Sequence, residues 1–243
     1  MIAIAYITAP RPVLTLERSL ASMRDAGFDQ DIRIFSDGSV DCRLDENMYV
    51  RRNVPLLGNL RNWLKALRTL VEITQEPFLM VCEDDILWAK NSHRALRDDL
   101  FNIQTWEGFG CLSLYLPIRM SKMCEKAEST SRLRDGIHSH GMQIGFKMWG
   151  AQCLVLSRAS AHALLDSAEL HNYLEGPKHW DKNVDGIVSA CFQAIGLTMF
   201  WRVPCLVNHT LGEANSSLGY PPDRFELTTK YWTGDAWPSR GKP

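Results

Sequence analysis

Short apolar runs alternate with helical periodicity along most of the chain. Residues 2–7 and 78–82 are almost continuously apolar, which is typical of strands covered on both faces. Over residues 60–73, apolar side chains recur at i, i+3, i+4 and i+7, and a weaker form of this pattern covers residues 14–26. The same reasoning predicts strands over residues 31–35, 110–116, 150–156, 198–203 and 205–207, and helices over residues 92–103, 159–165 and 185–195.

This alternation predicts an α/β fold with a mostly parallel central sheet and helices on both of its faces. Two segments depart from the pattern. Residues 119–141 are polar and turn-rich, which indicates a long loop that is mobile or functional. Residues 219–243 are rich in Pro, Gly and aromatic side chains, which indicates a tail wrapped over the surface. We therefore expect one domain over residues 1–218, followed by this tail.

Composition and charge narrow the class of protein. A hydrophobic content of 45% and a charged content of 23% are ordinary for a soluble globular protein. The net charge of −1 gives no general attraction to nucleic acids or membranes. The seven cysteines are scattered and never form a C-x-x-C pair, which argues against a disulfide framework or a zinc site. The apolar N-terminal run is too short for a signal peptide or a membrane span, so we expect a cytoplasmic protein without membrane association.

Three consecutive carboxylates follow the strand expected over residues 78–82. Glu83, Asp84 and Asp85 repel one another, yet apolar side chains flank them. Ligands of parallel α/β sheets bind outside the carboxyl ends of the strands. The same edge receives the residues that follow the first two strands, namely Thr8, Pro10, Arg11 and Asp37. Acidic runs are often solvated turns, but hard oxygen ligands after a buried strand favour a Mg²⁺ or Mn²⁺ site, and the cation would balance the three charges.

Several segments, taken in order, resemble glycosyltransferases of the GT-A fold. The resemblance is to N-acetylglucosaminyltransferases with a Glu-Asp-Asp motif and to small bacteriophage glycosyltransferases. The segments that carry it are GNLRNWLKALRTL, the EDD triplet, GCLSLYLP, WGAQCLVLSR, DKNVDGIVSACFQAIG and PCLVNHTLGEANSSLG. The last of these is one residue longer than the tightest form in the family. The resemblance implies a Rossmann-like GT-A domain that transfers a sugar from a nucleotide diphosphate sugar, with a divalent cation.

The resemblance also implies roles for individual residues. Asp85 would ligate the metal, Glu83 and Asp84 would contact the sugar and ribose, and His209 would be a second metal or diphosphate contact. Contacts to the donor would come from Thr8, Pro10, Arg11, Asp37, Arg61 and Asn62. His209 also follows an expected strand and precedes a Gly/Ser-rich turn, a position that suits either a metal ligand or an ordinary loop histidine.

Sugar transfer with inversion needs a general base for the acceptor hydroxyl. Asp185, at the start of an expected helix, is the first candidate, although an aspartate there could serve only as an N-cap. Asp181, beside Trp180, is the rival candidate. On the acceptor side we expect Tyr115, Trp149 and Trp180, whose aromatic faces could stack on sugars or bases.

Basic side chains suggest the acceptor. Arg51, Arg52, Arg61, Lys65 and Arg68 occur within 18 residues, and the loop over residues 119–141 adds more. Such residues could follow the phosphates of a DNA acceptor that carries a hydroxymethylated pyrimidine, although solvated surface is the more common role of basic residues. The function predicted is transfer from a UDP-sugar to that acceptor. The alternatives are a saccharide acceptor, a sugar-phosphate nucleotidyltransferase, for which ITAPRPVLT lacks the expected glycines, or an inactive nucleotide-sugar-binding module.

Overall fold

The computed structural model describes residues 2–11, 14–39, 48–117, 120, 122–123, 126, 134–139, 150–176 and 183–209. Trp149, Trp180, Asp181 and the expected tail over residues 219–243 lie outside these ranges, as does most of the expected loop over residues 119–141. No helix in the described part of the chain is both long and apolar enough to cross a bilayer.

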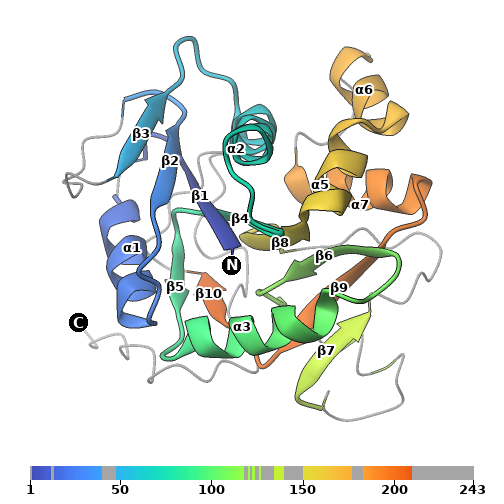
Figure 1. Cartoon of the computed structure of the whole chain (residues 1–243). Coiled ribbons are helices and arrows are strands. Elements are labelled where there is room, and N and C mark those ends of the chain that lie inside the picture. Colours follow the sequence, from blue (N-terminus) through green and yellow to red (C-terminus); the bar gives the residue numbers. More distant parts are fainter. Residues whose placement is uncertain are drawn as a thin grey trace.

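A sheet of eight strands forms the centre of the molecule, in the order β3-β2-β1-β4-β8-β6-β9-β7 (Figure 1). Its strands are β1 (Ile2–Thr8), β2 (Ile32–Ser36), β3 (Tyr49–Arg52), β4 (Phe78–Glu83), β6 (Phe109–Ser113), β7 (Gly136–Ser139), β8 (Cys153–Ser157) and β9 (Thr198–Val203). Only β8 and β7 run against the direction of the other six. The predicted α/β class with a mostly parallel sheet is confirmed.

Helices cover both faces of this sheet (Figure 1). They are α1 (Leu16–Asp25), α2 (Asn59–Ile73), α3 (Ser92–Ile103), α5 (Arg158–Leu165), α6 (Ala168–Glu175) and α7 (Val184–Ala194). The strand β1 shows how the faces are separated, since its side chains alternate between two cores. Ala3, Ala5 and Ile7 pack with α2, α5 and α7, whereas Ile4 and Tyr6 pack with α1 and α3.

Several short elements could not be predicted from periodicity. The strand β3 is exposed along its whole length, and β5 (Ile86–Trp88) has only three residues, so neither shows a clear burial pattern. The helix α6 was also missed, and β7 lies inside the segment expected to be a loop. The strand expected over residues 205–207 is displaced, because β10 spans Val207–His209 and pairs antiparallel with β5. This displacement matters, since it places His209 within a strand instead of after one.

Candidate functional site

The acidic triplet closes β4, in the middle of the sheet between β1 and β8. Glu83 is the last residue of the strand, and Asp84 and Asp85 form the turn that leads into β5. Asp84 is 2% exposed and Asp85 is 6% exposed. The alternative of a solvated acidic turn is therefore wrong, and these carboxylates need buried partners.

Arg11 supplies a positive charge to two of the carboxylates. Its Nη2 lies 2.6 Å from Asp84 Oδ1, and its Nη1 lies 2.7 Å from Asp85 Oδ2. Thr8 Oγ1 donates a hydrogen bond of 2.5 Å to Asp84 Oδ2. These contacts follow from the pairing of β1 with β4, which brings the chain after Thr8 to the end of β4. Two of the four predicted strand-end residues, Thr8 and Arg11, thus contact the triplet.

His209 reaches the same carboxylates through the small β5–β10 sheet. In the register of that sheet His209 lies opposite Ile86, the residue after Asp85. Its Nε2 lies 3.2 Å from Asp85 Oδ2. One donor atom each from Glu83, Asp85 and His209 lies within 4.8 Å of the others. We call these three residues the ligand cluster, and it includes Glu83, for which the resemblance implied a sugar contact.

The ligand cluster suits a divalent cation of the Mg²⁺ or Mn²⁺ type. Two carboxylates and one imidazole offer hard oxygen and borderline nitrogen donors. The 3.2 Å between His209 Nε2 and Asp85 Oδ2 is close to the separation of ~3 Å for two ligands at right angles on a cation with bonds of ~2.1 Å. His209 Nδ1 is buried and has no hydrogen-bond partner among the described residues.

The carboxylates perturb one another strongly. Burial, together with the charges of Asp85 and Asp185, raises the pKa of Glu83 to about 8. Burial also raises the pKa of Asp84 to about 7, against the attraction of Arg11. The pKa of Asp85 is lowered despite its burial, because His209 and Arg11 stabilise its charged form. If all three carboxylates were ionised, their charge would exceed that of Arg11 and His209, so either bound protons or a cation must supply the difference.

Asp185 lies in the first turn of α7 and is fixed by the backbone of a distant loop. Its Oδ1 accepts from the Ala151 amide at 2.8 Å, and its Oδ2 accepts from the Gly150 amide at 3.0 Å. The N-cap is Asn183, whose side chain accepts from the Asp185 amide, so the N-cap interpretation of Asp185 is wrong. Burial raises the pKa of Asp185 to about 6. The Glu83 amide donates to the Gln152 carbonyl at 2.8 Å, one residue from Ala151, whose amide donates to Asp185, so the two acidic residues are held by the same segment.

Other residues predicted to contact the donor make structural contacts around α2. Asp37 accepts from the amides of Leu57 and Gly58, at 2.6 and 2.7 Å, and so holds the loop that leads into the helix. Asn62 is buried and donates to the Phe35 carbonyl at 2.9 Å. Arg61 is exposed and donates to the Leu174 carbonyl of α6 at 3.4 Å. Pro10 is exposed beside the turn at Gly38.

Two contacts of the cluster complete its surroundings. The Asn59 side chain, the first residue of α2, donates to Glu83 Oε1 at 3.3 Å. Asn59 was not among the residues expected at the site, although its place directly after Gly58, whose φ is +81°, marks a helix start. The centroid of the buried Tyr115 ring lies 6.4 Å from that of the His209 ring, so Tyr115 packs beside the cluster, and its role on the acceptor side stays a prediction.

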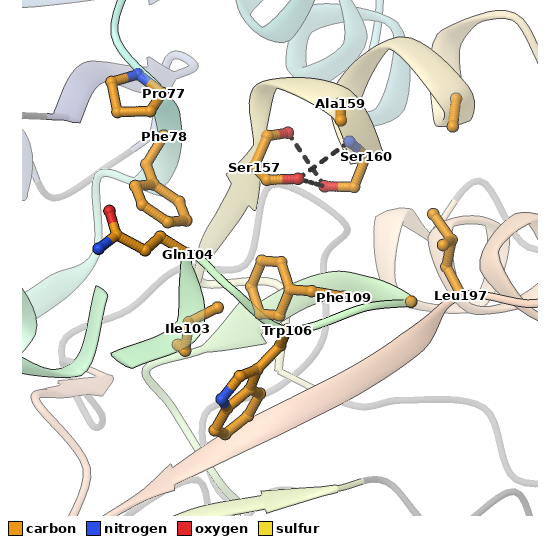
Figure 2. A pocket seen from close by; sticks show the side chains of 12 residues that line it. Pro77, Phe78, Ile103, Gln104, Trp106, Phe109, Ser157, Ala159, Ser160 and Leu197 are labelled. Atoms are coloured by element: carbon orange, nitrogen blue, oxygen red, sulfur yellow. Dashed lines mark hydrogen bonds between the residues drawn. The ribbon is translucent and has the colours of Figure 1, made fainter. Parts of the chain in front are cut away.

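An uncharged cleft lies at the amino ends of β4 and β6, and Figure 2 shows side chains that line it. It has a volume of about 420 Å³. Its walls include Phe78 and Phe109, the first residues of β4 and β6, and Leu197, which precedes β9. The described residues that line this cleft carry no charge. It therefore lies apart from the ligand cluster and offers none of its chemistry.

Comparison with known proteins finds resemblance only at the level of solved structures. No family model and no curated protein matches the sequence. The chain is similar to 2-C-methyl-D-erythritol 4-phosphate cytidylyltransferase from Thermus thermophilus, with 14% identity, a TM-score of 0.45, and coverage of 85% of this chain and 91% of that one. It is also similar to the glycosyltransferase GlyE of Streptococcus pneumoniae, with 9% identity, a TM-score of 0.43, and coverage of 82% of this chain and 45% of that one. A nucleotidyl transferase from Methanothermobacter thermautotroptrophicus is similar with 12% identity, a TM-score of 0.43, and coverage of 82% of this chain and 86% of that one. With TM-scores of 0.45 or less, these similarities do not assign an activity.

Proposed function

We propose that this protein is a metal-dependent glycosyltransferase that uses a UDP-sugar donor. The observation that carries the proposal is the ligand cluster at the carboxyl end of β4, with Arg11 paired to its aspartate and with Asp185 and Glu83 bound to the adjacent residues Ala151 and Gln152. A cation and an arginine at one strand end suit a diphosphate leaving group, whose charge develops as the sugar departs. A nearby fixed carboxylate suits the acceptor hydroxyl.

Each residue then has a role in one displacement. Glu83, Asp85 and His209 would hold Mg²⁺ or Mn²⁺, which supplies positive charge to the diphosphate oxygens. Arg11 adds a second positive charge for the same group. Asp185 accepts the proton of the acceptor hydroxyl. The oxygen of that hydroxyl then bonds to the anomeric carbon, and the bond from this carbon to the diphosphate breaks. A carboxylate whose pKa is raised to about 6 is charged at neutral pH and is more basic than an ordinary aspartate.

The proposed acceptor is a hydroxymethylated pyrimidine in DNA. Support comes from exposed basic side chains: Arg51 and Arg52 lie on the exposed edge strand β3, and Arg68 is exposed on α2. Lys65 instead donates to Asn53 Oδ1 at 2.5 Å, and Arg61 donates to α6, so these two also have internal contacts. Because basic residues with internal contacts need not bind DNA, a saccharide is the competing acceptor.

Thermal unfolding of the full chain with nucleotides tests the donor class. We expect UDP with Mn²⁺ to raise the melting temperature more than either alone. Ligands that bind only the folded state stabilise it, and the diphosphate and the cation would bind together. Asp85→Asn should lose this joint effect, and Asp98→Asn, at an exposed carboxylate of α3, should retain it. Failure of UDP, GDP and CDP alike to stabilise the protein with Mn²⁺ or Mg²⁺ would contradict the proposal. Pyrophosphate release from a nucleoside triphosphate and a sugar phosphate would instead indicate a nucleotidyltransferase.

The acceptor is tested by product analysis. The enzyme is incubated with a panel of UDP-sugars and either DNA that contains hydroxymethylcytosine or simple saccharides, and the nucleosides are analysed by mass spectrometry. A DNA acceptor predicts glycosylated nucleosides at a rate that falls as salt is added, because phosphate contacts release counterions. Sugar found only on saccharides, or a rate on DNA that is insensitive to salt, would exclude the DNA acceptor.

A further inference from the structure

The guanidinium of Arg11 lies where a cation bound to Asp85 would compete with it. Its two terminal nitrogens span Asp84 and Asp85, at 2.6 and 2.7 Å, and its side chain is 9% exposed. The oxygen of Asp85 that receives Arg11 Nη1 is Oδ2, the same atom that faces His209 Nε2 at 3.2 Å. One carboxylate oxygen therefore serves the arginine and also faces the imidazole of the ligand cluster.

We infer that Arg11 is a built-in counter-ion, which a divalent cation displaces from Asp85 and thereby makes available to the diphosphate of the donor. The inference rests on the proposed function, because it assumes that the ligand cluster binds a cation. Two positive groups close to one oxygen repel each other, and the doubly charged ion is the stronger competitor for it. Arg11 then keeps its contact with Asp84 or turns towards an anion.

The free donor capacity of Arg11 supports this second role. Its Nε is buried and has no hydrogen-bond partner among the described residues. A guanidinium that gives up Asp85 regains Nη1 as a donor and can bind a phosphate with two parallel hydrogen bonds. Cation and diphosphate would then bind cooperatively, because the cation frees the group that the diphosphate needs. By linkage, the diphosphate raises the affinity for the cation by the same factor.

Replacing Arg11 separates this role from a merely structural one, because the two affinities should move in opposite directions. At pH 8, isothermal titration with Mn²⁺ should show that Arg11→Gln binds the ion about tenfold more tightly than the wild-type chain, since a competing charge is removed. Titration of the Mn²⁺-saturated variant with UDP should show about tenfold weaker binding, since a charged phosphate donor is lost. The matched control is Arg202→Gln, which removes an arginine paired at 2.9 Å with Asp99 of α3 and should leave both affinities within about twofold.

The outcomes separate this inference from the proposed function. Mn²⁺ affinity that is unchanged or lower in Arg11→Gln overturns the displacement while the metal centre stands. No Mn²⁺ binding by the wild-type chain overturns both. Nitrogen NMR of the arginine side chains in the wild-type protein needs no stable variant. The Arg11 Nη signals, distinct while two carboxylates hold the guanidinium, should shift and merge on saturation with Mg²⁺, and signals that do not respond would refute the inference.

Discussion

The strands of the central sheet have different chemistry at their two ends, which we call the carboxyl edge and the amino edge of the sheet. The strand β4 begins with Phe78, in the wall of the uncharged cleft, and ends with Glu83, in the ligand cluster. The carboxyl edge also receives the first turns of α2 and α7, which carry Asn59 and Asp185. Helix N-termini present unpaired amides and partial positive charge, which favour carboxylates there. The fold thus places the buried charges of the ligand cluster at the carboxyl edge, whereas the cleft at the amino edge is lined by uncharged residues.

The largest effect should come from the carboxyl edge, where Asp185→Asn would remove the proposed base. We expect turnover to fall by about 10²–10⁴-fold, while UDP binding with Mn²⁺ is retained, because Asp185 is outside the ligand cluster. Single-turnover assays and titration with UDP measure the two quantities. The Asn side chain can accept from only one of the Gly150 and Ala151 amides, so the melting temperature should be recorded as well.

Asp181→Asn is the rival variant for this test. A near-normal rate in Asp185→Asn, combined with a large loss in Asp181→Asn, would transfer the role of base to Asp181. Asp98→Asn, at an exposed carboxylate, serves as the control and should keep the full rate.

At the amino edge, Phe109→Ala should reduce stability without changing metal binding. The Phe109 side chain is 6% exposed, stacks on Phe200 at 5.7 Å and meets Phe78 edge-on at 6.5 Å. Truncating a buried phenylalanine costs about 3–5 kcal/mol in the free energy of unfolding. Urea denaturation and Mn²⁺ titration measure the two quantities.

Phe101→Ala is the matched control on α3, since Phe101 is 72% exposed; its stability should stay within about 0.5 kcal/mol of the wild type. A Phe109→Ala protein that remained well folded but lost Mn²⁺ affinity would break the comparison, because it would couple the two edges.

The smallest effect concerns pH. The pKa values of Glu83 and Asp84 are raised to about 8 and 7, above those of the unfolded chain, and the pKa of His209 is raised by Asp85 despite burial. Between pH 6 and 8 the folded state therefore binds more protons than the unfolded state. In the presence of a chelator, its free energy of unfolding should fall as pH rises. The lowered pKa of Asp85 changes nothing in this window, since that group stays charged in both states.

Urea denaturation at pH 6, 7 and 8, with EDTA or with saturating Mn²⁺, measures this dependence. Mn²⁺ should reverse its sign, because the cation replaces the protons and binds better as they leave. Glu83→Gln should flatten the EDTA profile. A wild-type profile in EDTA that rises with pH would contradict the charge excess assigned to the carboxyl edge.

Local pattern was sufficient for the regular elements and for part of the site. The continuous apolar run of β1, whose side chains divide between two cores, and the apolar stripe of α2 at a period of 3.6 could both be predicted from apolar positions. Glu83, Asp84 and Asp85 could be assigned to a strand end for the same reason. The exposed β3 and the three-residue β5 could not be predicted, because neither is long and buried enough to show a period.

The sequence by itself therefore determined which segments form the layers and that a run of carboxylates ends a buried strand. Tertiary structure alone decided which positive groups meet that run. Arg11 reaches Asp85 because β1 lies beside β4, and His209 reaches it because β10 pairs with β5. Strand neighbours depend on contacts between distant segments, including the antiparallel β8 beside β4. Hydrophobic periodicity reports only whether a residue is buried, and not which strand lies next to it.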